Sequence, residues 1–180
     1  MGVITTDGSL SAIDFTIGNV YLTLNGVGFS ELDAGNDFSM ITVSSNALSS
    51  SAGNLITTTA SVLDRMTLLN DTRTNKQILS IRGSGTAVSA DYLATQNTSA
   101  QKLLTGITSA YDMSSYYNGT AQGTNTYSGT YPNSGLIFGR LTSSSSILNG
   151  FIQEIIIMPS NLTADIATYH SEINGYYSIY

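Results

Sequence analysis

Glu154 is an acidic residue within the most apolar stretch of the chain, residues 150–158. Hydrolysis of a glycosidic bond needs two carboxylates, about 5–5.5 Å or about 6.5–9.5 Å apart. Alternate residues of a strand share a face. The alternate positions around this acid hold Ile152, Ile156 and Met158, so no second acid follows on that face. We therefore interpret Glu154 as a structural residue, hydrogen-bonded at the edge of a sheet, and expect the protein not to be an enzyme.

His170 is the only histidine, and the chain has no cysteine. A single histidine supports neither a histidine-rich metal site nor a Ser-His-Asp triad. The absence of cysteine excludes disulfides and thiolate metal sites. We expect His170 to lie on the exposed face of a C-terminal helix.

A cluster of oxygen-bearing side chains lies before residue 38, at Asp33, Asn36 and Asp37. Calcium takes six to eight oxygen ligands, so these side chains could converge on a calcium ion together with Asp112, which precedes an expected hairpin. Asp and Asn are also ordinary turn-forming residues. We favour turn formation and keep calcium as the alternative.

Tyrosine side chains are the better candidates for binding, because each offers a flat apolar ring and a hydroxyl. Tyr117 follows Tyr116 in an expected strand, so one ring of that pair must face inward. Loop tyrosines can bind a ligand or simply pack, and both interpretations stay open. The candidate contacts for a glycan or a protein partner are Tyr117, Tyr127, Tyr131, Asn125 and Asn133.

The composition narrows the classes of partner. The 180 residues carry a formal net charge of −6, with only six Lys and Arg, and 10% of residues are charged. A phosphate backbone requires clustered basic residues, so nucleic acid is excluded as a partner. No apolar stretch approaches the roughly 20 residues that cross a membrane, so we expect no membrane insertion.

Period-two alternation of apolar and polar residues predicts strands along most of the chain. The pair Asn118-Gly119 is typical of a hairpin turn, with the return strand beginning at Ala121. We predict one all-β domain over residues 1–180, built as a two-sheet antiparallel sandwich. The expected strands are residues 13–17, 20–24, 38–43, 55–59, 66–69, 78–81, 103–108, 113–117, 136–139 and 150–158.

Two segments, residues 44–53 and 120–135, are rich in Ser, Gly or Asn and are expected to be irregular. Irregular segments of this length in compact domains are usually functional or form interfaces. The second segment contains the loop tyrosines, so recognition is expected there.

One short C-terminal helix is expected near the end of the chain. Thr163 can cap its start, and Gly175 suits a left-handed C-terminal residue. The tail, residues 176–180, is expected either to return as an edge strand or to dock on a neighbouring subunit. The residues at helical spacing are Ile166, Tyr169 and Ile173.

Several segments resemble parts of one fold family in the family's own order. They combine a Gly/Asp turn before a central strand, a strand before a Tyr-x-Asn-Gly type hairpin, and two closing strands. The chain therefore resembles a concanavalin A-like, laminin-G-like jelly-roll domain. It departs from that family in having no tryptophan, which removes a usual aromatic platform for sugars. The matching segments are residues 32–43, 102–108, 115–120, 135–139 and 149–157.

The closing segment and aromatic tail are similar to versions of this domain in bacteriophage virion proteins, both capsid decorations and tail-fibre modules. The resemblance implies a non-enzymatic protein of the virion surface, hence extracellular. It would pack in many copies against other virion structural proteins and bind cell-surface glycans weakly. It also implies calcium as a frequent ion of the family. The alternatives are a free carbohydrate-binding module or lectin and, disfavoured by the missing second carboxylate, a glycoside hydrolase.

Overall fold

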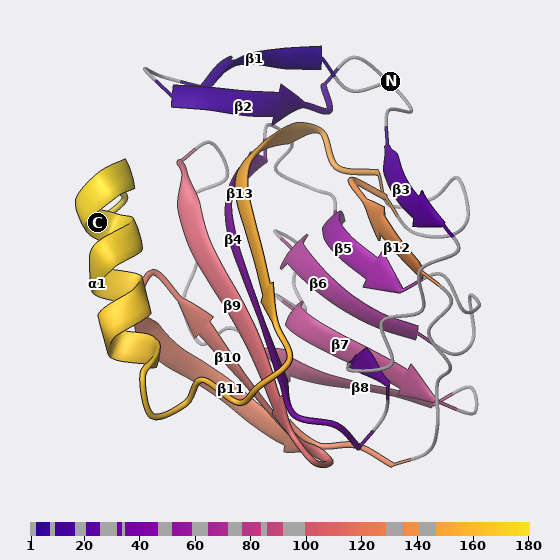
Figure 1. Ribbon diagram of the computed structural model, residues 1–180. Coiled ribbons are helices and arrows are strands. Elements are labelled where there is room, and N and C mark those ends of the chain that lie inside the picture. Colours follow the sequence, from indigo (N-terminus) through magenta and orange to yellow (C-terminus); the bar gives the residue numbers. More distant parts are fainter. Residues whose placement is uncertain are drawn as a thin grey trace.

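The computed structural model describes residues 3–7, 10–16, 21–25, 32–33, 35–46, 52–58, 65–71, 77–83, 86–91, 100–128, 135–140 and 147–180 (Figure 1). The elements are β1 (Val3–Asp7), β2 (Leu10–Asp14), β3 (Leu22–Asn25), β4 (Phe38–Asn46), β5 (Ala52–Thr58), β6 (Arg65–Asp71), β7 (Gln77–Gly83), β8 (Thr86–Asp91), β9 (Lys102–Ser109), β10 (Asp112–Tyr117), β11 (Thr120–Thr126), β12 (Gly135–Phe138), β13 (Gly150–Met158) and α1 (Ile166–Tyr177).

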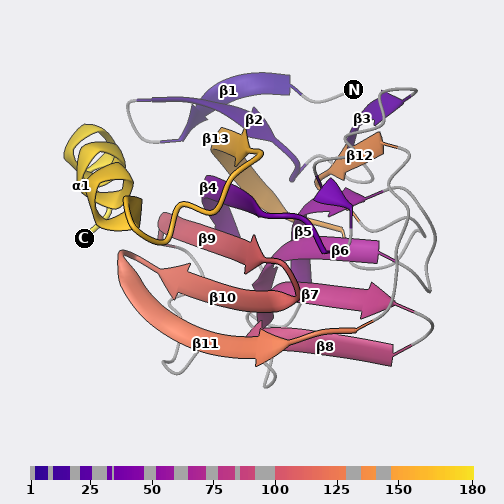
Figure 2. The ribbon, with the colours of Figure 1, turned by 60° about the horizontal axis from the view of Figure 1, so that its bottom comes forward.

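The strands form two antiparallel sheets that face one another, as Figures 1 and 2 show. One sheet has seven strands in the order β1-β2-β13-β4-β9-β10-β11, and the other has six in the order β3-β12-β5-β6-β7-β8. Helix α1 lies against the face of the seven-stranded sheet that points away from the six-stranded one, which we call the outer face. The predicted all-β sandwich with one short C-terminal helix is confirmed.

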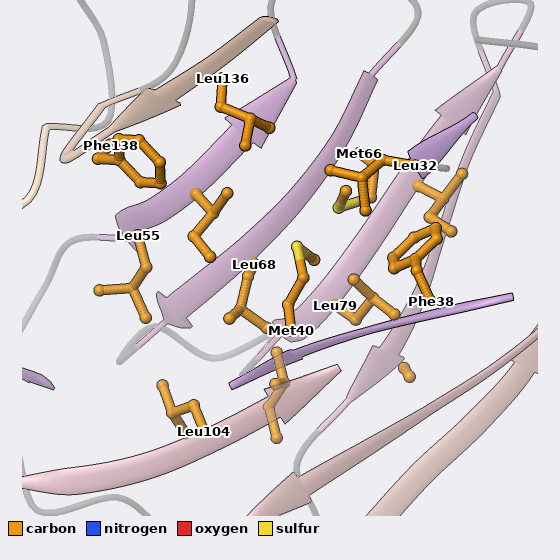
Figure 3. Close-up of a cluster of buried hydrophobic side chains, with 14 of the residues drawn as sticks. Leu32, Phe38, Met40, Leu55, Met66, Leu68, Leu79, Leu104, Leu136 and Phe138 are labelled. Carbon is orange, nitrogen blue, oxygen red and sulfur yellow. The ribbon is translucent and has the colours of Figure 1, made fainter. Parts of the chain in front are cut away.

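Strand β4 shows how alternation builds two apolar layers. Phe38 and Met40 point between the sheets, where they join the main core (Figure 3). Ile41 and Val43, at the intervening positions, pack in a second cluster beneath α1. All four side chains are at most 1% exposed. This strand is therefore apolar on both faces. Burying each of these side chains contributes about 1.5–3 kcal/mol to the stability of the fold.

Strand β9 lies between β4 and β10 and is buried along almost its whole length. Leu104 joins the main core, whereas Leu103 and Ile107 join the cluster beneath α1. Lys102 at the start of the strand is also fully buried, and this desolvation lowers the pKa of its amine to about 8. Nothing in the local sequence pattern indicated a buried lysine.

Strand β13 contains a bulge that changes the interpretation of its alternation. Ile152 pairs with Ser44 and Glu154 with Val43, which leaves Gln153 as one extra residue on β13. Ile152 therefore belongs to the main core, although alternate spacing had placed it on the face of Glu154. That expectation was wrong because a bulge shifts the phase of a strand by one residue.

The two ends of helix α1 differ from the predicted ones. It begins at Ile166, and its N-cap is Asp165, whose side chain makes no capping hydrogen bond, so the predicted Thr163 cap was wrong. Gly175 lies inside the helix with open space where a Cβ would be, and the left-handed residue is Ser178 instead. Ile166 and Ile173 are buried on the sheet, and the helix continues to Tyr177. Among the described residues, no helix is long and apolar enough to cross a membrane.

The hairpin of β10 and β11 is confirmed. Its turn residues Asn118 and Gly119 have φ angles of 46° and 75°. Two positive φ angles in succession are the conformation that favours Asn-Gly in a two-residue turn. The expected irregular segment 120–135 was wrong in its first part, because β11 continues the hairpin to Thr126. The ends of the other segment, 44–53, likewise belong to β4 and β5.

Candidate functional site

The outer face of the seven-stranded sheet is open along the β10–β11 hairpin, beyond the start of α1. The strand register aligns side chains of β9, β10 and β11 in two rows. One row is Ser109, Asp112 and Thr126, and the other is Ile107, Ser114 and Thr124. The hollow lined by these six residues and by Met113, Asn125 and Thr163 has a volume of about 360 Å³. We call it the hairpin pocket.

The polar groups of the hairpin pocket are only partly engaged. The Thr126 hydroxyl donates a hydrogen bond to Asp112 Oδ1 over 2.8 Å. Asn125 Oδ1 accepts from the Thr126 backbone N–H over 2.9 Å. The hydroxyls of four lining residues make no hydrogen bond to another described residue. They are Ser109, Ser114, Thr124 and Thr163.

This arrangement suits a ligand that carries several hydroxyl groups. A carboxylate accepts hydrogen bonds only, whereas each Ser or Thr hydroxyl both donates and accepts. The buried side chain of Ile107 adds a small apolar surface among these polar groups. The pocket volume falls at the lower end of the roughly 300–1,000 Å³ range of small-molecule sites.

Among the described residues that line the hairpin pocket, Asp112 is the one ionisable side chain, and it is exposed. This described lining contains no Lys, Arg or His. The pocket therefore presents hydrogen-bonding groups and one negative charge.

Tyr127 does not have the exposed ring that was expected of a loop tyrosine. Its side chain is 3% exposed and belongs to the main core. Its hydroxyl donates to the Ala110 carbonyl over 2.9 Å and accepts from the Gly35 N–H over 3.1 Å. Its assignment as a glycan-contacting ring is corrected to a buried brace between two loops, because long-range partners satisfy its hydroxyl.

Tyr111 is the exposed ring at this end of the sheet, and sequence reasoning missed it. It is 46% exposed and packs edge-to-face on Tyr127 with ring centroids 5.4 Å apart. The signal that could have revealed it is its place in the two-residue turn between β9 and β10, directly before Asp112.

The remaining residues predicted to contact a ligand lie in different parts of the structure. Tyr117 is half-buried against the main core, and this burial raises its pKa. Tyr116 packs on the other side of the sheet, beneath α1. The prediction that one ring of the pair faces inward is therefore confirmed, and that ring is Tyr117. Asn125 lines the hairpin pocket. Tyr131 and Asn133 lie outside the described residues.

The residues proposed as calcium ligands take part in turn and loop hydrogen bonds. Asp37 Oδ1 accepts a hydrogen bond from the Ala110 N–H over 2.8 Å. The backbone N–H of Asn36 donates to the Asp33 carbonyl over 3.2 Å, which closes a turn. Asp112 bonds Thr126 instead. Within the described part of the chain, no three His, Cys, Asp or Glu side chains are grouped as a metal site. The turn-forming interpretation fits these bonds.

His170 is buried, so its expected place on the exposed face of the helix was wrong. The side chain is 2% exposed, and its Nε2 lies 2.8 Å from the Thr105 hydroxyl of β9. Burial lowers its pKa to about 4, so the ring is neutral at physiological pH. Nδ1 is buried without a hydrogen-bond partner. Such an atom costs about 1–3 kcal/mol unless a ligand or water reaches it.

Glu154 has the hydrogen-bonded, structural contact that was expected. It lies on the outer face near the end of α1, where its carboxylate accepts a hydrogen bond from the Tyr177 hydroxyl. Burial first, and then this hydrogen bond and the charge of Glu154, raise the pKa of Tyr177.

Known structures share this fold at low sequence identity. The chain matches no family model and no curated protein by sequence. Domain 4 of AbnA, a GH43 extracellular arabinanase from Geobacillus stearothermophilus, solved with arabinotriose, is similar with a TM-score of 0.75 and 13% identity, over 93% of this chain and 80% of that one.

Two further structures extend the likeness. The CBM40 domain of Ruminococcus gnavus IT-sialidase, bound to α2,3-sialyllactose, has a TM-score of 0.61 and 10% identity over 83% of this chain and 97% of that one. The NanB sialidase from Streptococcus pneumoniae has a TM-score of 0.59 and 12% identity over 82% of this chain. This chain spans only 27% of that sialidase. At such identities the likeness shows the fold alone, a jelly-roll-like β-sandwich shared with carbohydrate-binding domains.

Proposed function

We propose that this protein is a non-catalytic carbohydrate-binding domain that holds a neutral oligosaccharide in the hairpin pocket. The observation that carries the proposal is the pocket itself, in which hydroxyls that make no hydrogen bond to a described residue lie near the Asp112 carboxylate. A sugar offers hydroxyls that can donate to the carboxylate and both donate to and accept from Ser and Thr. The fold neighbours solved with arabinotriose and α2,3-sialyllactose support the ligand class.

The charge of the pocket supports a neutral sugar over an acidic one. Asp112 is the single ionisable side chain of its described lining, and the whole chain has a formal net charge of −6. A sialylated glycan would bring its own carboxylate beside this charge, and like charges repel. A neutral sugar gains a charge-assisted hydrogen bond from the same group.

Isothermal titration with arabinotriose and with α2,3-sialyllactose tests both parts of the proposal. We expect arabinotriose to bind more tightly. Asp112→Asn should weaken arabinotriose binding by about tenfold, because hydrogen bonds to charged groups contribute about 1.5–3 kcal/mol. The same variant should lessen the disadvantage of sialyllactose.

Glu172→Gln is the matched control, because Glu172 is an exposed acid on α1 that does not line the pocket. It should leave both affinities at the wild-type value. Absence of binding by either saccharide would contradict the carbohydrate-binding proposal. An equal loss in both variants would contradict the role of Asp112.

An extracellular location and an attachment role on a virion remain predictions from the resemblance. Many copies of a weak site would give the avidity that such a role needs. Immunogold labelling of purified particles tests this role directly, and unlabelled particles would contradict it.

A further inference from the structure

A second hollow is lined by residues of α1 and of the turn of the β10–β11 hairpin, at the end opposite the hairpin pocket. Figure 2 shows the helix and the hairpin beside one another. The hollow has a volume of about 380 Å³. Turn residues 118–120 form one side, and His170, Ser171 and Asn174 line the other side. Spacings of three and four place these helix residues on one face of α1. Tyr180 lines the remaining side, and we call this hollow the tail pocket.

The ring of Tyr180 is held in place at the rim of the tail pocket. Asn174 Oδ1 accepts from the backbone N–H groups of Ile179 and Tyr180 over 2.8 and 3.0 Å, and its Nδ2 donates to the Tyr180 carbonyl over 2.8 Å. A Cβ at Gly119 would collide with the Tyr180 hydroxyl, so glycine lets the ring lie against the turn. The ring is still 54% exposed. A fixed but exposed aromatic ring is pre-organised for binding.

These bonds also correct the expectation for the tail. It does not return as an edge strand, since residues 176 and 177 belong to α1; docking on a neighbouring subunit stays a prediction. The side chain of Asn174 folds the tail back on the last turn of α1.

The walls of the tail pocket carry polar groups without charge. Asn118 Oδ1 accepts from the Leu103 N–H over 2.9 Å, whereas its Nδ2 makes no hydrogen bond to a described residue. The hydroxyls of Thr120 and Ser171 likewise make none within the described part of the chain. Uncharged donors and acceptors beside one aromatic face match a ligand that is polar at its edge and apolar on its face.

We propose that the tail pocket is a second binding site for a neutral saccharide, with the Tyr180 ring covering one face of the sugar and Asn118, Thr120 and Ser171 bonding its hydroxyls. The class of ligand rests on the proposed function, whereas the place of the site rests on the geometry of this pocket alone.

The two pockets are separate sites on one hairpin. Asn118 in the tail pocket lies six positions along the hairpin from Asp112 in the hairpin pocket, which corresponds to about 20 Å of extended strand. One monosaccharide cannot reach both. A polymer that offers repeated sugars can engage both, so the domain would bind it with avidity.

Titration of the ¹⁵N-labelled protein with arabinotriose, followed by backbone amide shifts, tests the second site. We expect saturable shifts at Gly119 and Ser171, separate from those at Ser114 and Thr124. Tyr180→Ala should weaken the affinity measured from the shifts at Gly119 and Ser171 by about fivefold, since an aromatic contact contributes roughly 0.5–1.5 kcal/mol beyond its buried area. The affinity measured from the shifts at Ser114 and Thr124 should keep its wild-type value.

Tyr176→Ala is the matched control, because Tyr176 is another tyrosine of this end of the chain, 67% exposed, that does not line the pocket. It should bind as the wild type at both sites. Unchanged shifts at Gly119 and Ser171 in Tyr180→Ala, or no shifts there in the wild type, would overturn the second site. Shifts confined to the hairpin pocket would leave the proposed function intact, and shifts confined to the tail pocket would overturn the hairpin pocket instead.

Discussion

The outer face of the seven-stranded sheet has two parts that share strands but differ in what covers them. The part beneath α1 is aliphatic, with Ile41, Val43 and Leu103 packed against the helix. The part along the hairpin carries Asp112 and Thr124 with other hydroxyl side chains, and α1 does not cover it. The same backbone therefore supports a core on one part and a pocket on the other. Side-chain chemistry decides where the helix starts, and so where a ligand can bind.

The covered part should carry the stability. Ile41→Ala should lower the free energy of unfolding by about 2–5 kcal/mol, because this side chain is 1% exposed and its removal leaves a cavity. Thr124→Ala, on the open part, should change it by less than about 0.5 kcal/mol. Urea denaturation measures both values. Equal losses would show that the two parts do not differ in this way.

His170 lies at the border of the covered part and should make stability depend on pH. Burial lowers its pKa from the ordinary 6.5 to about 4, so between these values the unfolded chain binds a proton that the folded chain does not. Stability should therefore be lost as pH falls from 6.5 to 4, by roughly 3 kcal/mol in total.

Comparing how steeply stability falls with pH in the wild type and in a His170 variant separates the effect of this histidine from that of the carboxylates, which titrate in the same range. His170→Gln should show a flatter loss of stability between pH 6.5 and 4 than the wild type, whatever its stability at pH 7. Thermal denaturation across this pH range gives the slopes. Parallel profiles would contradict a buried neutral His170.

The open part should depend on hydrogen bonds for its support. Tyr127→Phe removes the hydroxyl that bonds Ala110 and Gly35, and should cost about 1–3 kcal/mol in the free energy of unfolding. Tyr111→Phe, at an exposed ring beside it, should cost less than about 0.5 kcal/mol. Chemical denaturation of the two variants compares them, and a neutral Tyr127→Phe would remove the brace assigned to this residue.

Local patterns predicted much of the fold. Alternation located the strands that became β4, β9 and β10: both faces of β4 and β9 are buried, and β10 buries alternate residues. The Asn118-Gly119 turn was predictable because only a few residue pairs tolerate two positive φ angles. Strands β1 and β8 were missed, since both are short and lack a clear apolar alternation.

The site was harder to predict because its residues depend on distant partners. Tyr127 is buried because Gly35, 92 positions away, donates to its hydroxyl. His170 is buried because Thr105, 65 positions away, contacts its ring. Asn125 was identified as a polar contact, whereas Asp112 was weighed only as a calcium ligand. No local pattern could show that β9, β10 and β11 align Asp112 with hydroxyl side chains across three strands.

The extra residue in β13 has a consequence for how this chain tolerates changes in length. Gln153 is accommodated as a bulge, and beyond it Glu154 to Met158 keep their partners on β4 in unbroken order. Removing Gln153 would straighten the strand without turning any later side chain to the opposite face. An alignment with sequence relatives should therefore place single-residue insertions and deletions at this point. Elsewhere in β13 the same change would exchange the residues of the main core with those beneath the helix.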